Sequence, residues 1–208
     1  MADWVTISSL ATAGGTMVLA IATFASVRSA NRAARIAERS FQVGLRPVLV
    51  PARADDPVQK VGWADGRLDH LRGGVALVGE QDGNILLAMA LRNVGAGLAV
   101  LHGGHVRPDR VGIDTEHAPP EEFRLLHRDL YVPAGDTGFW QVGLRNPEDP
   151  LRRELAATIE GRQPITIELL YGDHEGGQRT VTRFIVSPRE NDEWFCAVLR
   201  HWSVEDSR

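Results

Sequence analysis

Four histidines in the middle of the chain have a residue type and spacing that could hold a metal ion. His102 and His105 stand three residues apart, and His117 and His127 follow downstream. Neutral imidazole is the commonest side-chain ligand for metals such as zinc. On an ideal strand, however, residues three positions apart point to opposite faces of the sheet. The spacing therefore favours separate histidines over one metal site, and no metal or other cofactor is expected.

The run Val-Pro-Ala-Gly at 132–135 resembles a turn found in cupin barrels. That resemblance implies a metal site with a His-x-His pair, a glutamate and a later histidine, whereas this chain has His-x-x-His. A metal-binding, cupin-like barrel enzyme that uses the region of His102 and His105 is the alternative interpretation of the chain.

A Gly-x-Gly run follows one of the predicted strands and must be weighed as a dinucleotide fingerprint. Gly95 and Gly97 supply its first two glycines, but Val100 stands at the third position. The pair Gly103 and Gly104 would interrupt the helix whose N-terminus receives the pyrophosphate. The run is therefore predicted to be a turn between two strands.

Three further groups of polar or reactive side chains have structural explanations. The Asp-His-Glu run at 173–175 falls where a hairpin tip is expected, and such tips are usually polar. Cys196, the single cysteine, stands in an apolar segment, which predicts an inert buried thiol. Trp194 and Trp202 are expected on one face of the last strand, which favours core packing over a ligand cage.

The elements that would position these residues follow a long N-terminal segment without charge. From Trp4 to Val27 no residue is charged. As a helix this segment would extend about 36 Å, which is enough to cross a hydrocarbon core of about 30 Å. A core helix of a soluble domain rarely runs this long without a polar face. The segment is predicted to span a membrane.

The charges beside this segment predict its orientation. A cleaved signal peptide needs positive charge before the apolar run, whereas here only Asp3 precedes it. The arginines come after the run, and by the positive-inside rule that end stays in the cytoplasm. The N-terminus is therefore expected on the outer side of the cell membrane. The part of the chain after the span is expected in the cytoplasm.

Two faces of this helix could make contacts. Small residues recur every fourth position and suit close approach of a membrane-protein partner or a second copy of the chain. Arginines spaced by four, three and four residues form a stripe that could contact anionic lipid headgroups. The helix-packing face consists of Ser8, Thr12, Thr16 and Ala20, and the headgroup stripe of Arg28, Arg32, Arg35 and Arg39.

After Pro47 the apolar periodicity changes from helical to alternating. The segment 84–92 is apolar on both faces and should be a central strand, preceded by a turn at 79–83. The segment 55–74 is polar and glycine-bearing and is expected to be a loop around an isolated Trp63. The expected strands are 45–52, 75–78, 84–92, 98–106, 122–132, 138–144, 165–171, 179–187 and 193–204, with one short helix within 146–160.

The predicted fold class is mainly β. Many short strands with one internal helix favour an antiparallel sandwich of immunoglobulin-like form, and helices with the spacing of a parallel sheet are missing from the pattern. The expected domains are a transmembrane anchor at 1–27, an arginine-rich juxtamembrane helix at 28–44 and a cytoplasmic β-sandwich at 45–208. The net charge of −4 argues against a nucleic-acid partner.

Six runs of the sequence stand out, at 27–34, 45–47, 132–135, 139–140, 170–180 and 200–202. Together they resemble a group of uncharacterised actinobacterial membrane proteins with a single span and a C-terminal β-rich domain. The resemblance implies a membrane-bound protein, but it implies no activity and carries over no catalytic residue. From the residues themselves we expect a membrane-anchored, non-enzymatic interaction or scaffold module.

Overall fold

The computed structural model describes residues 4–174 and 178–204. The chain divides into two compact units, residues 1–44 and residues 45–208. The first unit contains the helix α1, and the second contains eleven strands and the helix α2 in its described part. This division corresponds to the change from helical to alternating periodicity after Pro47.

Helix α1 (Trp4–Gly44) is one uninterrupted helix of 41 residues. It contains no proline and is rich in alanine, which has the highest helix propensity. It ends at Gly44, because Pro47 disfavours helical geometry at the residue before it. The charge-free part and the arginine-rich part therefore belong to one rod, and the side chains described along it are exposed.

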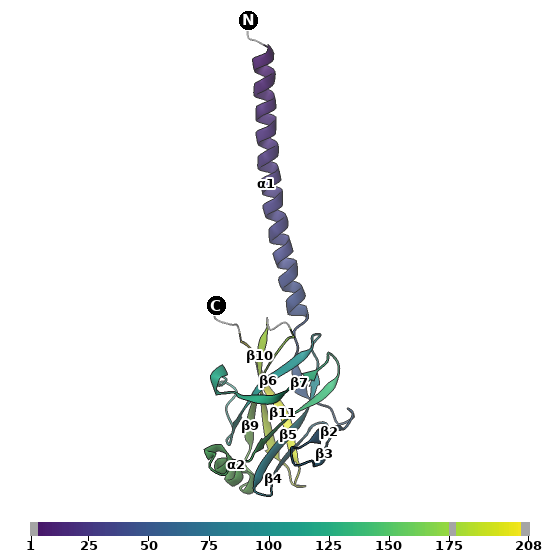
Figure 1. The fold of residues 1–208 in the computed structure, drawn as a ribbon, viewed down its shortest axis with the longest axis vertical. Helices are drawn as coiled ribbons and strands as arrows, with labels where there is room; N and C mark the ends of the chain where they lie inside the picture. The colour runs from purple at the N-terminus through teal and green to yellow at the C-terminus, as the bar shows by residue number, and fades with distance from the viewer. Residues whose placement is uncertain (1–3, 175–177, 205–208) are drawn as a thin grey trace. The chain divides into compact units, whose positions relative to one another are not determined.

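Nine strands of the second unit form one antiparallel sheet, which curls into a half-barrel (Figure 1). The order is β1-β5-β4-β11-β10-β9-β6-β7. Strands β1 and β4 pair with successive parts of one edge of β5, and β8 pairs along its other edge. The expected arrangement of two sheets of immunoglobulin type is not confirmed, because these strands join a single continuous sheet. The strands are β1 (Leu49–Pro51), β4 (Val75–Gln81), β5 (Asn84–Asn93), β6 (Ala99–Arg107), β7 (Arg124–Val132), β8 (Thr137–Leu144), β9 (Ile165–Gly172), β10 (Arg179–Pro188) and β11 (Trp194–Val204).

The main core fills the concave side of this sheet. Alternate residues of β5 and β9 point into it, and helix α2 (Pro150–Glu160) adds Leu155, which is fully buried. The side chain of Asp149 caps α2 by accepting a hydrogen bond from Leu151 N at 3.1 Å. The largest side chains of this core include Trp140, Tyr171, Phe184, Met89 and Leu91.

A second, smaller core covers the convex face of β5. The segment expected to be a loop at 55–74 contains a hairpin of β2 (Gln59–Gly62) and β3 (Leu68–Leu71). Val61, Trp63 and Leu71 lie over Leu86 and its neighbours on β5. The loop prediction was wrong because strands of four residues leave almost no periodic signal. Strand β5 is buried on both faces, as the sequence predicts for a central strand.

The turn between β4 and β5 is tighter than the expected run 79–83. Residues Asp82 and Gly83 alone make it, with φ of 50° and 75°. Two successive positive φ angles match the twist of paired strands, and Asp-Gly is a favoured sequence for such turns. The strands therefore extend to Gln81 and from Asn84.

A β-bulge in β11 separates the two tryptophans expected on one face. Arg183 opposes Arg200 and Phe184 opposes Val198, so Leu199 is the extra residue. Because an extra residue reverses the alternation of faces, Trp194 packs in the main core while Trp202 lies on the convex side. The sequence prediction assumed an unbroken strand and was wrong on this point.

The glycine run 95–97 packs against the chain that enters the sheet at β1. A Cβ at Gly97 would lie 1.7 Å from the carbonyl oxygen of Leu45, and one at Gly95 2.2 Å from that of Arg46. The buried Asn93 side chain ties this turn together, accepting hydrogen bonds from Val48 N and Gly95 N. The run is a turn between two strands, as predicted, and its glycines are required for close backbone approach.

Replacing Gly97 with alanine should destabilise the β-rich unit by about 2 kcal/mol or more, because two backbone segments would have to separate. The measurement is urea unfolding of the full-length protein in detergent, followed by tryptophan fluorescence. Gly79→Ala on β4 is the control, since a Cβ there meets nothing within 4 Å. Equal midpoints for the two variants would contradict the close approach.

Candidate functional site

The predicted headgroup stripe lies on the second half of α1. The side chains of Arg28, Arg32 and Arg35 are exposed, and no ion pair within the described part of the helix neutralises them. Arg39 continues the spacing along the helix, but its side chain lies outside the described residues. The stripe is available to an anionic surface.

The small-residue face lies on the first half of α1, where Ser8, Thr12, Thr16 and Ala20 are exposed. The hydroxyls of Thr12 and Thr16 donate to the carbonyl oxygens four residues earlier, each at 2.9 Å. An intrahelical bond of this kind satisfies the hydroxyl without a partner. This face can therefore contact lipid or a second helix without leaving those two hydroxyls unpaired.

Among the described residues, one helix is long and apolar enough to cross a membrane. The stretch Ser8–Glu38 contains an 18-residue segment with a mean hydropathy of 1.7, and none of that segment is buried. The main apolar residues of the stretch, such as Leu19 and Phe24, are each 69% exposed to solvent. Exposed apolar surface of this extent calls for lipid or a partner. A signal sequence near an N-terminus has the same length and apolar composition.

The four histidines do not converge in the described part of the chain. His102 is the extra residue of a bulge against β9 and lies near Gly172, whereas His105 faces Glu168. The ring centroids of His117 and Trp202 lie 5.5 Å apart in a T-shaped arrangement, and the side chain of His127 lies outside the described residues. No group of three histidine, cysteine, aspartate or glutamate side chains in that part could hold a metal ion.

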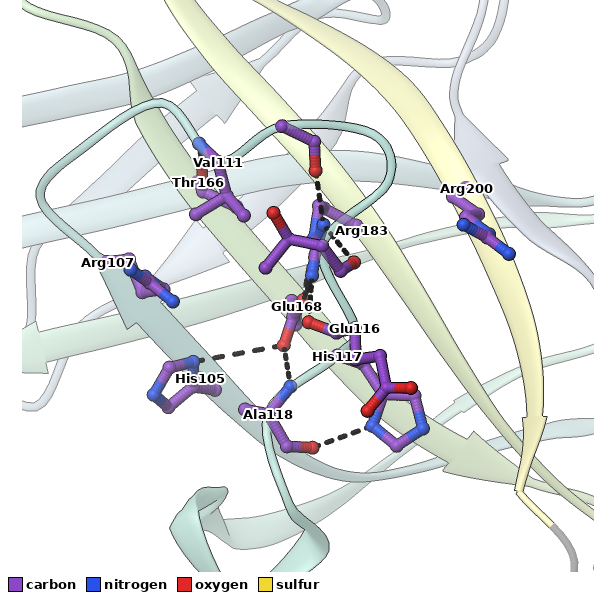
Figure 2. Close-up of polar contacts among 12 residues, drawn as sticks. His105, Arg107, Val111, Glu116, His117, Ala118, Thr166, Glu168, Arg183 and Arg200 are labelled. Carbon is purple, nitrogen blue, oxygen red and sulfur yellow. Dashed lines mark hydrogen bonds and ion pairs between the residues drawn. The ribbon is translucent and has the colours of Figure 1, made fainter.

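A buried ion pair occupies the convex face of the sheet instead (Figure 2). Glu168 on β9 and Arg183 on β10 are cross-strand partners, and both side chains are 1% exposed. The Arg183 Nε and Nη2 groups lie 2.7 Å and 2.6 Å from the same oxygen, Glu168 Oε1. The short distances and the burial make this a strong, charge-assisted contact.

The segment 108–119 covers this ion pair with its own backbone. Arg183 donates to the carbonyl oxygens of Gly112, Thr115 and Glu116 at 2.7–2.9 Å, and Ala118 N donates to Glu168 Oε2 at 2.8 Å. A buried charge is tolerated only when its hydrogen-bonding groups are satisfied. The pair therefore holds a long segment without secondary structure against the sheet.

Aromatic and cationic side chains seal the outer side of the pair. The Trp202 ring lies 4.7 Å from the guanidinium carbon of Arg183 and 5.1 Å from that of Arg200. Such cation–π contacts stabilise a partly desolvated guanidinium. Each nitrogen of the Arg183 guanidinium and each oxygen of the Glu168 carboxylate therefore has a partner within the protein, as a buried pair requires.

The sequence signal for this pair is its position relative to the hairpin loop, which a pattern within a single strand does not contain. Gly172 and Arg179 are the pair of residues next to the hairpin loop. Glu168 stands four residues before Gly172, and Arg183 stands four residues after Arg179. Opposite charges at equal distances from a hairpin loop become direct neighbours. The expected tip at 173–175 lies only partly within the described residues, since Glu175 is outside them.

His105 lies at the edge of this network. Its Nδ1 is 3.9 Å from Glu168 Oε2 and its Nε2 is 3.6 Å from Glu122 Oε2. Burial lowers the pKa of His105, although Glu168 and Glu122 oppose this effect. The folded domain therefore favours the neutral imidazole.

Cys196 is buried in the main core beside Met89, with 3.6 Å between the sulfur atoms. Burial raises its pKa to about 12, which keeps the thiol protonated at physiological pH. Its surroundings are those of a structural thiol.

A groove opens where the curled sheet stops short of closure, between β7 and β8. It has a volume of about 710 Å³ and is lined mainly by apolar side chains, a size within the usual range of ligand sites. Side chains from both faces of β8 reach it, Trp140 and Val142 from the core side and Gln141 from the convex side. On β7 its wall includes Leu125, which is 77% exposed.

Two polar atoms in the wall of this groove have no hydrogen-bond partner among the described residues. They are the indole Nε1 of Trp140, a donor, and Oε1 of Gln141, an acceptor. Trp140 is 1% exposed, and its indole edge lies against Gly104, which also lines the groove. Buried polar groups in native structures are nearly always paired, so the groove is a candidate binding site. The sequence predicts a strand at 138–144 and no role for these two residues.

Comparison with known protein families, with curated proteins and with solved structures finds no match.

Arg183→Met should loosen the segment 108–119, because three carbonyl oxygens lose their donor and Glu168 loses its counter-charge. Removing one partner of a buried pair costs about 3–5 kcal/mol. Faster tryptic cleavage at the exposed Arg110 reports release of the segment, and the urea midpoint reports the stability.

The control is Arg107→Gln, which breaks an exposed pair with Asp109 worth at most about 1 kcal/mol. If Arg183→Met is cleaved at Arg110 no faster than this control, the ion pair does not hold the segment.

The lowered pKa of His105 predicts that acid destabilises the domain. Below the ordinary histidine pKa of about 6.5 the unfolded chain binds a proton that the folded domain resists. Stability is therefore complete above that value and falls as the pH drops toward the folded-state pKa. The thermal midpoint should fall between pH ~7.5 and pH ~5.5, and His105→Gln should reduce the fall. An unchanged fall in that variant would exclude His105 as its source.

Proposed function

We propose that this chain is a single-span membrane protein that holds its β-rich unit in the cytoplasm as a non-enzymatic module for binding another protein. The observation that carries the proposal is the combination of an exposed helix, whose first part is charge-free, with a folded unit that presents an apolar groove. Tethering raises the local concentration of such a module near membrane partners without any further contact.

The arginine stripe supports the orientation and a role for lipids. Arg28, Arg32 and Arg35 are exposed directly after the charge-free segment, and Arg39 continues their spacing. Basic side chains that follow a membrane span favour the cytoplasmic side. Each contributes about 1 kcal/mol of attraction to an anionic leaflet. We assign the stripe to contact with lipid headgroups.

The chemistry of the β-rich unit supports a binding role over catalysis. The buried pair of Glu168 and Arg183 is enclosed by protein, and the Cys196 thiol is buried with a raised pKa. The groove instead offers apolar walls with a donor and an acceptor in them. A surface of this composition binds a ligand by burial and orients it by a few polar contacts.

The small-residue face of α1 supports a second contact within the membrane. Ser8, Thr12, Thr16 and Ala20 leave little side-chain bulk along one line of the helix. Close backbone approach at such a line drives association of membrane helices. We assign this face to a second copy of the chain or to a helix of a membrane partner.

The topology is tested by fusing the C-terminus of the full-length chain to two reporters, one active only in the cytoplasm and one active only outside. We expect activity of the cytoplasmic reporter alone, with the protein in the membrane pellet after high-salt washing. Replacing the four arginines with glutamine should transfer at least part of the activity to the outer reporter, because the charge bias is removed.

The matched control replaces the same four arginines with lysine, which retains the charge and should retain the orientation. Activity of the outer reporter in the unmodified chain would overturn the proposed orientation, and recovery of the uncleaved chain in the soluble fraction would overturn the anchor.

A further inference from the structure

Strands β7 and β8 each have one edge without a partner strand in the described part of the sheet. β7 pairs with β6 only, and β8 pairs with β5 only. The two strands are joined by the turn 133–136 and contact each other, yet they form no ladder. Their facing edges therefore border the groove with free backbone donors and acceptors. Proteins usually cover, charge or shorten such edges.

The two unpartnered side-chain atoms in the groove complement an extended peptide. The Trp140 Nε1 group needs an acceptor, and Gln141 Oε1 needs a donor. An extended peptide segment carries both, an acceptor in each backbone carbonyl oxygen and donors in its N–H groups and hydroxyl side chains. An acyl chain carries neither along its length, so lipid would leave both buried atoms unsatisfied.

The walls and rim of the groove specify the side chains of the occupant. Leu125, Leu126, Leu130 and Val142 offer apolar contacts. The exposed guanidinium of Arg145 stands at the rim. Arg124, also at the rim, is already paired with Asp149. An apolar segment that carries one carboxylate therefore matches the groove in both polarity and charge.

We propose that an extended, apolar peptide segment of a partner protein, carrying an acidic residue, binds in this groove and adds a strand between β7 and β8. The inserted backbone pairs with the free edges. One of its carbonyl oxygens also accepts a hydrogen bond from Trp140 Nε1 on the core side, and a hydroxyl side chain of the segment donates one to Gln141 Oε1 on the convex side. Its carboxylate contacts Arg145. This inference deepens the proposed function by naming the recognition mode of the binding module, β-strand addition.

The probe is a synthetic peptide of about seven residues, which matches the eight residues of β8 at about 3.3 Å per residue. It alternates valine with threonine and ends on glutamate. The full-length protein is kept in detergent with its tryptophan indole nitrogens isotopically labelled. Titration is followed by peptide fluorescence anisotropy and by the indole N–H resonances, with Trp140 assigned by a Trp140→Phe variant.

We expect saturable binding that moves the Trp140 indole resonance downfield, as a new hydrogen bond requires. Leu125→Asn should weaken binding by about tenfold or more, corresponding to about 1.4 kcal/mol. The matched control Val94→Asn, at an exposed valine outside the groove, should bind as the unmodified protein does. The same peptide with alternate backbone nitrogens methylated should not bind, because it cannot pair with both edges.

Three results would overturn the inference. Equal binding of the methylated peptide shows apolar adsorption without strand addition. Movement of the Trp140 resonance by decanoate but not by the peptide shows an acyl-chain site. Movement of that resonance with protein concentration alone, lost in Leu125→Asn, shows that a second copy occupies the groove. None of these readouts depends on membrane orientation, so failure of the topology experiment is distinguishable from failure of this one.

Discussion

Backbone hydrogen bonding along a curled sheet is the constraint on which the rest of the β-rich unit depends. Each strand must place its N–H and C=O groups against a neighbour, and nine strands do so in a continuous path that bends around one core. The path ends at β7 and β8, which approach each other without pairing. Three other parts of the chain cover the faces of this sheet. Helix α2 packs on the main core, the hairpin of β2 and β3 covers the convex face of β5, and the segment 108–119 covers the ion pair on β9 and β10. The groove lies where β7 and β8 stop short of pairing.

The convex face of β9 and β10 shows how charge can replace apolar packing as a means of covering a sheet. Glu168 and Arg183 stand where an apolar pair would ordinarily receive a helix. Instead, Arg183 binds three carbonyl oxygens of the segment 108–119, and Trp202 lies on its guanidinium. A segment without regular structure has free backbone carbonyls, and a buried guanidinium has several donors in one plane. Each satisfies the other, so the segment is ordered without forming a helix or a strand.

Much of the strand content could be predicted because alternation is a local signal. The apolar run of β5 identified a central strand, and the alternation of Ile165, Ile167 and Leu169 identified β9. The hairpin of β2 and β3 was missed because short strands carry too few residues for a period to emerge. The face of Trp202 was mispredicted because the extra residue Leu199 leaves no mark on the apolar pattern. The groove residues Trp140 and Gln141 were placed in a strand, but nothing local indicated that β8 is an edge.

The sequence by itself determined the long helix, the position where helical periodicity ends, and the mainly β character of the remainder. These properties depend on residue type and on spacings of a few positions, which set local hydrogen bonding and the face each side chain takes. Only the tertiary structure decided which strands are neighbours, that the sheet curls without closing, and that Trp140 and Gln141 meet at the resulting groove. Those features depend on pairings between residues far apart in the chain, and the free energy of such a pairing is shared among all the strands of the sheet. No single segment encodes it.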